Sequence, residues 1–422
     1  MLQVDHVYEF FHTILFKKYE VYTLPNGVIP LSMNIGDASF FHIFNYNNTT
    51  NKIFFHDQEP IIDQFIFAYL DVFNYPTVEE YQTVDNFINC LITKSARHRF
   101  ENQSTISDYL YRQYVNNPRL LFKLPTSMVV SEKSKLVDTI SIKYSLSILY
   151  YFFHGFAALD HYRGFYALNY NKQVIKDYTY DYITFNRLVS NDRSYRCYFV
   201  SLLYKHKLIK KGQVSFGINN ERVTWEHELT NSHSKLSSKA RVHMRKYLPR
   251  DKPLIIDGTD ILGSASADIP RCINDSLWHI VTETVFYYDK LHLTEKIFKP
   301  IVMKQPFMLL GAVGNLAYLK SYGFKTFEGI IDESYDTIVD NDARTEAVVQ
   351  QIAWYCALSA EEKRSVIEAI APIVEYNFHH FYGEFKHIIT RELLDNCKTL
   401  FKDIGYDDNA IAYDDIYKVL TT

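Results

Sequence analysis

The sequence is poor in cysteine and in net charge. Its 422 residues include five cysteines, which lie far apart and form no CxxC pair. This spacing predicts neither a disulfide framework nor a zinc site, and it favours a reducing, cytoplasmic setting. The 45 Lys and Arg residues nearly balance the 49 Asp and Glu residues, for a net charge of −4. That balance excludes a protein that coats nucleic acid by charge alone, but not an enzyme that contacts DNA briefly.

Several motifs with known chemistry are absent. The chain has no GxGxxG, no P-loop and no HExxH, so dinucleotide oxidoreductases, P-loop kinases and zincins have no support. The DxD triplet at residues 340–342 directly precedes a predicted helix and is explained by helix capping. The His and carboxylate residues have no metal-ligand spacing. We therefore predict no metal site.

The sequence also lacks a long hydrophobic run. Its most apolar stretch, residues 145–159, contains His154 and is too short to span a bilayer. The first 20 residues carry acidic side chains where a signal peptide has positive charge, and no small-residue cleavage site follows. We expect no membrane insertion, no removed leader and a location in the cytoplasm, which is the host cytoplasm if the protein is viral.

Apolar residues make up 47% of the chain and aromatic residues 16%, which is enough for sizeable cores. Short β-like runs alternate with helical stretches, and this alternation predicts an α/β fold. A polar stretch without an apolar period, residues 169–180, indicates a domain boundary. In the first half we expect strands at residues 52–56, 127–130 and 150–154 and helices at residues 79–90 and 106–116.

The second half has a clearer pattern. Its strongest signal is a helix over residues 294–302, a strand from Pro306 to Gly311, a helix over residues 314–322 and a strand at residues 325–327. This order predicts a parallel crossover unit, whose ligands lie beyond the carboxyl ends of the strands. Upstream we expect strands at residues 182–188, 214–216 and 253–256, a helix at residues 193–206 and a buried segment at residues 277–286. Downstream we expect helices at residues 343–356, 360–374 and 381–401.

The tripeptide Thr294, Glu295 and Lys296 opens one of these helices. Thr294 is a good N-cap, and a helix N-terminus offers free N–H groups and a positive dipole end to a phosphate. In the first turn, Glu295 is placed to bind ribose hydroxyls and Lys296 to neutralise a diphosphate. The alternative is that Glu295 merely stabilises the helix dipole.

Three arginines lie between a predicted strand and the next helix, in the run FNRLVSNDRSYR. Guanidinium groups match phosphate oxygens, and an arginine at a strand end is well placed to meet a leaving diphosphate. We favour Arg187 and Arg193 over Arg196 for this role. Ordinary surface charge at a helix start is the alternative.

Two polar groups follow predicted strands in the first half. The segment FFHDQEP contains His56, Asp57 and Glu59, and the segment HGFAALDHYRG contains His154, Asp160 and Arg163. A carboxylate at a strand end near apolar neighbours can act as a general base, because partial burial raises its pKa towards neutral. The alternative is a pair of polar turns with hydrogen-bonded side chains.

These motifs carry a family resemblance. The segment LHLTEKIFKPIVMKQPFMLLG, followed by GFKTF, resembles the donor-binding half of the inverting, metal-independent glycosyltransferases related to the α-1,3-fucosyltransferases. The run FNRLVSNDRSYR has a counterpart upstream in that group. The fuller pattern of HDQEP, HGF, NR, TEK, LG, GF and DESYD is most similar to glycosyltransferase-like proteins of bacteriophages and other large viruses. The resemblance is good over residues 182–336 and thin in the first half.

The resemblance implies a GT-B-like α/β fold of two facing Rossmann-like domains with a C-terminal helical segment. The acceptor-side domain would span residues 1–175, the donor-binding domain residues 176–375, and the C-terminal helices residues 376–422. The donor would be a nucleotide sugar such as a UDP- or GDP-sugar, with no metal and no other cofactor. Helix dipole and side-chain cations would replace the metal at the diphosphate.

The resemblance also implies roles for single residues. Glu295 would bind the ribose, Lys296 the diphosphate, and Arg187 or Arg193 the leaving group. Glu59, with Asp57 as the alternative, would be the catalytic base. The donor site would further include Thr294 and Gly311, and the acceptor side would include His56, His154, Asp160 and Arg163.

The acceptor and the activity itself remain open at this stage. The acceptor alternatives are a glycan, a protein and hydroxymethylated phage DNA, the last being a DNA modification reaction. A basic track formed by residues 205–211 with Arg241, Arg245 and Lys246 would suit DNA, whereas the alternative is a solvated helix face. Instead of a glycosyltransferase, the chain could be an inactive sugar- or nucleotide-binding module of the same fold.

Overall fold

The computed structural model divides the chain into two compact units. The first unit contains residues 1–156 and 387–422, and the second contains residues 157–386. Residues 157–175, which we expected at the end of the first domain, belong to the second unit. The structure describes residues 20–23, 41–47, 52–56, 126–130, 133–134, 147–170, 172, 178–190, 193–217, 225–231, 234–249, 254, 271–287, 290–403 and 414.

The first unit contains a five-stranded sheet with the order β1-β3-β2-β4-β6. β1 is parallel to β3 and β4 is parallel to β6, whereas β2 is antiparallel to both of its neighbours. The sheet is therefore mixed and differs at β2 from the all-parallel sheet of a Rossmann-like domain. The strands of this unit are β1 (Glu20–Thr23), β2 (Phe41–Asn47), β3 (Lys52–His56), β4 (Thr126–Val130), β5 (Lys133–Ser134) and β6 (Ser147–Tyr150).

Two helices cross the division between the units. α7 (Phe153–His161) begins in the first unit, and α17 (Lys386–Asp403) ends in it. Within the first unit, α17 is tied to the strands by two polar contacts. Asn396 donates a hydrogen bond to the carbonyl of Tyr150 at 2.7 Å, and Lys133 forms an ion pair with Glu392 at 3.0 Å.

The second unit contains a four-stranded, all-parallel sheet with the order β11-β9-β7-β8. It establishes an α/β fold that is compatible with a Rossmann-like domain. β7 and β9 are completely or almost completely buried, which explains their near-continuous apolar sequence. The strands of this unit are β7 (Tyr180–Asn186), β8 (Gly212–Phe216), β9 (Ser276–Thr282), β10 (Lys290–Leu291) and β11 (Phe307–Leu310).

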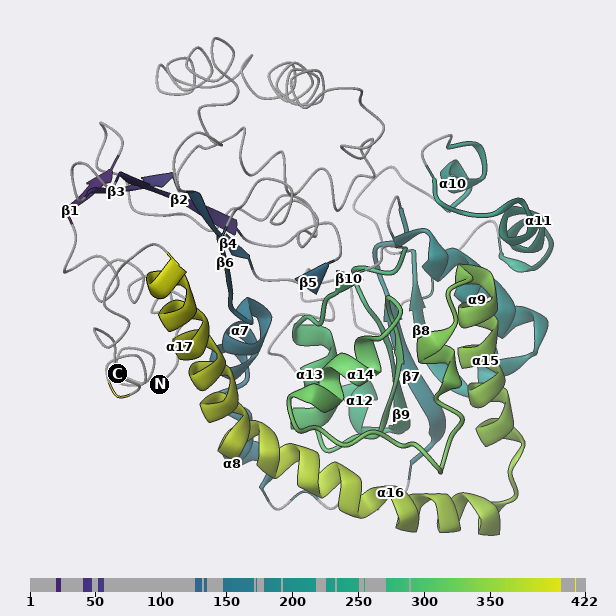
Figure 1. Ribbon diagram of the computed structural model, residues 1–422. Coiled ribbons are helices and arrows are strands. Elements are labelled where there is room, and N and C mark those ends of the chain that lie inside the picture. Colours follow the sequence, from purple (N-terminus) through teal and green to yellow (C-terminus); the bar gives the residue numbers. More distant parts are fainter. Residues whose placement is uncertain are drawn as a thin grey trace. The chain divides into compact units, whose positions relative to one another are not determined.

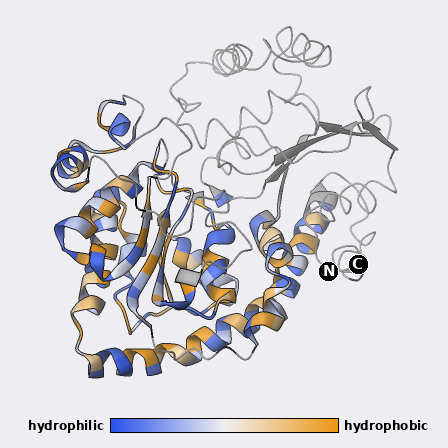
Figure 2. Ribbon diagram, turned by 180° about the vertical axis from the view of Figure 1, so that it is seen from behind, coloured by the Kyte–Doolittle hydropathy of each residue, from blue (hydrophilic) through white to orange (hydrophobic). Residues whose placement is uncertain are grey.

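Helices cover both faces of the parallel sheet. α9 and α15 lie on one side and α13 and α14 on the other (Figure 1). Hydrophobic residues concentrate on the strands and on the helix faces that meet them (Figure 2). The helices are α8 (Phe165–Asn169), α9 (Tyr195–Lys205), η5 (Leu208–Lys210), α10 (His227–Thr230), α11 (Ser238–Tyr247), α12 (Arg271–Asn274), α13 (Glu295–Val302), α14 (Asn315–Ser321), η6 (Ser334–Thr337), α15 (Asn341–Ala357), α16 (Ala360–His380) and the π-helical turn η7 (Phe381–Phe385).

Most predicted elements that fall on described residues are confirmed within a few positions. The strands at 52–56, 127–130, 182–188 and 214–216 correspond to β3, β4, β7 and β8, and the strand from Pro306 corresponds to β11. The helices at 193–206, 294–302 and 314–322 correspond to α9, α13 and α14, and the later ones to α15, α16 and α17. The helices predicted at 79–90 and 106–116 lie outside the described residues, as does all of the 253–256 strand except Leu254.

Two strand predictions are wrong. Residues 150–154 do not form a strand, because β6 ends at Tyr150 and the chain turns into a helix in which Gly155 and Phe156 donate to the carbonyl of Phe152. Residues 325–327 form no strand because side chains bind their backbone groups. The amide of Lys325 donates to Asn377, and the amide of Phe327 donates to Glu333.

None of the described helices is both long enough and apolar enough to cross a membrane.

Candidate functional site

The order of the parallel sheet creates a topological switch point between β7 and β9. From β7 the chain passes through α9 to β8 on one side, and it later returns to β9 on the other side of β7. The loops that follow β7 and β9 therefore diverge. In open α/β sheets, the crevice that binds ligands lies at this place, outside the carboxyl ends of the strands. Asn186 ends β7 and is followed by Arg187, and Glu283 follows the last residue of β9.

Glu283 is a fully buried carboxylate at this edge. One of its oxygens accepts a hydrogen bond from the Thr294 amide at 3.1 Å. The other accepts from the Thr294 hydroxyl at 2.7 Å and from the Thr284 amide at 3.1 Å. Burial raises the pKa of Glu283, while the charge of Lys296 and the bonds from Thr294 act in the opposite direction. Glu283 thus fixes the start of α13 to the end of β9.

Thr294 is the N-cap of α13, as predicted, because its hydroxyl accepts from the Lys296 amide at 3.4 Å. The ammonium of Lys296 donates to the hydroxyl of Thr284 at 2.9 Å and to that of Thr294 at 3.3 Å. It also forms an ion pair with Glu295 at 2.9 Å, in which the two side chains are 17% and 22% exposed. The carboxylate and the ammonium of this pair therefore lie together at the helix start, both within reach of solvent.

The arginines after β7 have different surroundings. Arg196 is buried and donates to the carbonyls of Leu188, Thr282 and Glu283 at 2.9, 2.7 and 3.2 Å. Arg196 therefore joins the loop after β7 to the end of β9, and its role is structural.

Arg193 lies at the start of the α9 segment and is half-buried. Burial, and next the charge of Arg196, lower the pKa of Arg193 to about 10, whereas the nearby charge of Glu295 raises it. Arg193 thus interacts electrostatically with the first turn of α13. Arg187, directly after β7, is also half-buried.

Asn186 adds an unusual polar atom to this edge. Its side chain is fully buried, and its Nδ2 donates to the hydroxyl of Thr184 at 3.1 Å. Its Oδ1 is buried and has no hydrogen-bond donor among the described residues. Buried acceptors without a donor are uncommon in folded proteins and indicate a bound water or a ligand group.

A buried tyrosine also fixes the first turn of α13. Tyr162 is fully buried and donates to the carbonyl of Glu295 at 3.1 Å. Further along the helix, the ring of Phe298 packs against Phe381 and Phe385, with ring centroids 5.6 and 5.3 Å apart. Because α13 is anchored at its first turn and at Phe298, the positions of Glu295 and Lys296 are set by the core of the second unit.

Gly311 follows β11 at the same edge. A Cβ atom there would lie 2.8 Å from Nδ2 of Asn315 and 3.4 Å from Cβ of Glu283. Asn315 cannot move cheaply, because its amide group makes two bonds of 3.1 Å to the backbone of His292. Gly311 therefore makes room for the side chains that shape the site.

The N-terminus of the neighbouring helix α14 is already occupied by a carboxylate. Asp336 accepts hydrogen bonds from the amides of Leu316 and Ala317 at 2.9 and 3.2 Å. An internal anion thus sits where a phosphate would otherwise bind. This leaves α13, rather than α14, as the helix start with cationic side chains beside it.

The acidic triplet at 340–342 has a structural role. Asp340 is the N-cap of α15 and accepts from the Ala343 amide at 2.7 Å, and Asp342 accepts from the hydroxyl of Ser237. The capping interpretation is confirmed. Among the described residues, no group of three or more His, Cys, Asp or Glu side chains is arranged to hold a metal ion.

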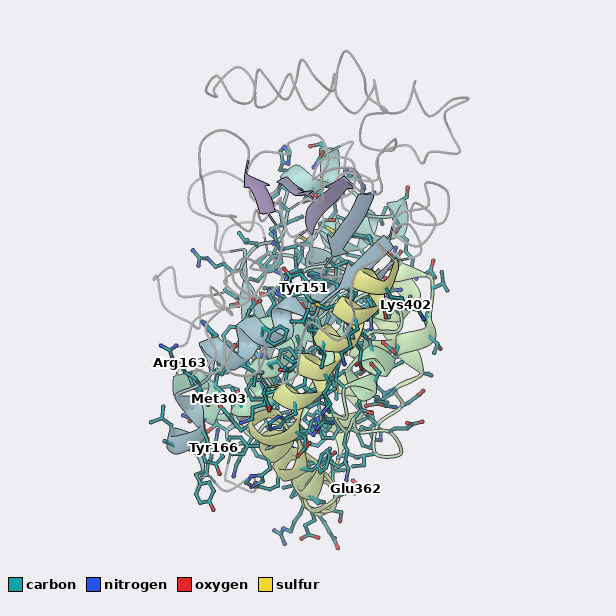
Figure 3. All side chains as sticks on the ribbon, turned by 60° about the vertical axis from the view of Figure 1, so that its left-hand side comes forward. Tyr151, Arg163, Tyr166, Met303, Glu362 and Lys402 are labelled. Atoms are coloured by element: carbon teal, nitrogen blue, oxygen red, sulfur yellow. The ribbon has the colours of Figure 1, made fainter. Side chains whose placement is uncertain are left out.

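The residues predicted for the acceptor side belong to separate elements or lie outside the described residues. Asp57 and Glu59 lie outside it, and His56 is the last residue of β3. His154 and Asp160 are both in α7. Arg163 follows α7, is exposed and extends away from the ribbon (Figure 3).

Sequence reasoning missed four residues of this edge. They are Tyr162, Asn186, Glu283 and Thr284. Glu283 and Thr284 stand in the apolar run LWHIVTETVF, where a polar pair inside a buried segment was the available signal. Comparison of the chain with models of known families, with curated proteins and with solved structures finds no match.

Proposed function

We propose that this chain is an inverting, metal-independent glycosyltransferase that moves a sugar from a nucleotide-sugar donor to an acceptor hydroxyl. The observation that carries the proposal is the pairing of Glu295 with Lys296 at the start of α13, beside the β7/β9 switch point. An N-terminal helix end, a lysine and an arginine meet there, and each of these favours a bound diphosphate. The motif resemblance supports the same assignment.

The Glu295–Lys296 ion pair is suited to open when the donor binds. The ammonium has three hydrogen-bond donors, and all three are used by Glu295, Thr284 and Thr294. A diphosphate must replace one of these acceptors, and the partly exposed Glu295 is the nearest to solvent. The carboxylate of Glu295 then accepts from ribose hydroxyls while the ammonium of Lys296 binds the phosphates. Each partner thus exchanges the other for a group of the donor.

The chemistry of transfer follows from this arrangement. A base takes the proton of the acceptor hydroxyl, and the oxygen attacks the anomeric carbon from the face opposite the diphosphate. Negative charge then grows on the departing phosphate oxygen. Lys296, Arg193 and the N–H groups of α13 lower the barrier if they are aimed at that oxygen, because preorganised donors need no rearrangement during the reaction.

A donor panel tests the proposal. Thermal melting is measured with UDP-, GDP-, ADP- and CMP-sugars in a metal-free buffer that contains a chelator. Release of the leaving nucleotide is followed in parallel, which is the nucleoside diphosphate for the first three donors and CMP for the last. A donor at about 100 times its Kd stabilises the folded protein by about 2.7 kcal/mol. We expect one nucleotide class to raise the Tm and to be slowly hydrolysed. Unchanged melting with all four classes would contradict the donor site.

The inactive binding module predicts a different outcome. It would bind one nucleotide or sugar class and raise the Tm in the same way, but it would release no nucleoside diphosphate even in the presence of glycan, protein or hydroxymethylated DNA acceptors. The release assay therefore separates the two functions.

A further inference from the structure

A basic surface lies on the side of the second unit that carries α9 and α11. These two helices pack against each other. Residues 205–211 and α11 together contain eight Lys and Arg residues and no Asp or Glu, in a chain whose net charge is −4. α11 is predominantly hydrophilic (Figure 2). Positive charge therefore gathers at the end of α9, on the η5 segment that follows it, and on α11.

Two of the eight cations, Arg241 and Lys239, bind neighbouring parts of the second unit. Arg241 points inward and donates to the carbonyls of Leu229, Asn231, Ser234 and Leu236. Lys239 is paired with Glu346. The other six are exposed, and none makes an ion pair with a carboxylate among the residues that the structure describes. We call these six the basic surface: Lys205, Lys207, Lys210, Lys211, Arg245 and Lys246.

Lys207 occupies a backbone conformation that lysine does not favour. It follows the C-cap of α9 with φ of 56° and ψ of 27°, in the left-handed region. Glycine is the usual residue at this position after a helix, because a Cβ atom costs energy there. Folding alone would therefore favour glycine, and a lysine here adds charge to the surface at the expense of stability.

A half-buried histidine lies close to this charge. His243 in α11 donates to or accepts from the hydroxyl of Ser201 in α9 at 2.8 Å. Burial, and next the charge of Lys205, lower the pKa of His243 to about 4. The neutral histidine thus joins the two helices without charge repulsion beneath the lysines.

We propose that the basic surface binds the sugar-phosphate backbone of a nucleic acid. Six exposed cations that form no ion pair with a described carboxylate, on α9, α11 and the η5 segment that follows α9, match a polyanion with regularly repeated phosphates better than a single anion. Five of the six are lysines, which bind phosphates as point charges and need no fixed geometry. The surface is therefore suited to contacts that ignore base sequence.

A membrane with anionic lipids fits the basic surface less well than a nucleic acid does. Helices that bind at a membrane surface place large apolar side chains opposite their lysines. Among the described residues of α11, the exposed apolar side chain is Val242, which is too small for such an anchor. The proposal does not depend on the glycosyltransferase assignment, because the six residues lie outside the donor site.

Binding of a fluorescein-labelled DNA duplex to the full-length chain tests the proposal. Fluorescence anisotropy is measured from about 50 to 200 mM salt. The variant Lys205→Gln/Lys207→Gln/Lys246→Gln should bind at least about tenfold more weakly, with a salt slope that is smaller by about 3, since each lost phosphate contact reduces it by about 1. Arg364→Gln removes an exposed charge from α16 and should leave binding unchanged.

Lys207→Gly separates binding from folding. Because glycine suits the left-handed position, this variant should keep or raise the Tm and yet weaken DNA binding. The proposal is wrong if the wild type does not bind the duplex, or if the triple variant binds as well as Arg364→Gln. It is also wrong if vesicles with anionic lipids displace the duplex and bind more tightly, which would identify a membrane as the partner. None of these outcomes depends on donor binding.

Discussion

Glu283 places a charge where the core and the site meet. A buried carboxylate loses its hydration and needs compensating donors, and here three hydrogen bonds and the charge of Lys296 supply them. The side chain connects the end of β9 to the N-cap of α13. At the scale of single residues, this contact sets the geometry on which donor binding depends.

The buried carboxylate makes stability depend on pH. Burial raises the pKa of Glu283 above the ordinary value of about 4.3, so the folded state holds this proton more tightly than the unfolded chain. The stability linked to this proton is fully present below the ordinary pKa and is lost as pH rises through the raised value. We expect the free energy of unfolding of the wild type to fall relative to that of Glu283→Gln as pH rises above the ordinary pKa of about 4.3, by about 1.4 kcal/mol per unit of pKa shift.

Urea denaturation of both proteins across this pH range measures the difference. Buffers of equal ionic strength keep the screening of Lys296 constant. The prediction is contradicted if the free energy of unfolding of the wild type rises relative to that of Glu283→Gln with increasing pH. That result would show that the hydrogen bonds and Lys296 stabilise the anion of Glu283 by more than burial destabilises it.

Gly311→Ala tests the packing around Glu283. The added Cβ meets the anchored amide of Asn315 and the side chain of Glu283, so we expect a loss of about 1 to 3 kcal/mol of stability by overpacking. Gly383→Ala is the matched control. It lies in the helical turn η7 with open space around its Cα, and alanine there should be neutral or stabilising by about 0.4 to 1 kcal/mol. Equal effects of the two substitutions would contradict the packing at Gly311.

At the scale of elements, α13 depends on its N-cap. Thr294 is buried and its hydroxyl both donates to Glu283 and accepts from Lys296. Thr294→Val keeps the volume and removes these bonds, so we expect a loss of about 1 to 2 kcal/mol. Thr294→Ser keeps the hydroxyl and should cost clearly less. Chemical denaturation of the two variants gives the comparison, and an equal loss would mean that methyl packing, rather than the hydroxyl, holds the helix start.

The sequence predicted α13 well because its signals are local. Thr294 caps the helix, and apolar residues recur at a spacing of four, as in Ile297 with Ile301 and Phe298 with Val302. The failed strand at 325–327 shows the opposite case. Its backbone groups are bound by Asn377, 52 residues further along, and by Glu333, and no local pattern reveals such competition. The run at 150–154 failed because a short, wholly apolar segment has no period that separates strand from helix.

The candidate site was predictable only in part for a similar reason. Thr294, Glu295 and Lys296 form a motif in one short segment. Their partners are remote, since Glu283 lies 11 residues before Thr294 and Tyr162 lies 133 residues before Glu295. The sequence likewise does not reveal that Arg196 binds carbonyls of the β7 and β9 loops.

At the scale of the whole molecule, strand order decides where a ligand can bind. The alternation of strands and helices predicts a parallel crossover, but the side on which each strand joins the sheet is a tertiary property. The order β11-β9-β7-β8 puts the switch point between β7 and β9. Arg193 and Lys296, which lie 103 positions apart in the numbering of the printed sequence, thereby reach the same edge of the second unit.

Titration calorimetry with UDP, GDP and ADP tests the central claim most directly, because it measures binding of the diphosphate without requiring an acceptor. We expect one of these nucleotides to bind the wild type in the presence of a chelator. Lys296→Gln should bind it at least about tenfold more weakly, as expected for the loss of a charged hydrogen bond of about 1.5 to 3 kcal/mol. The control variant Arg364→Gln should bind it as tightly as the wild type does. Failure of all three nucleotides to bind, or equal binding by Lys296→Gln, would contradict the claim that the start of α13 holds a diphosphate.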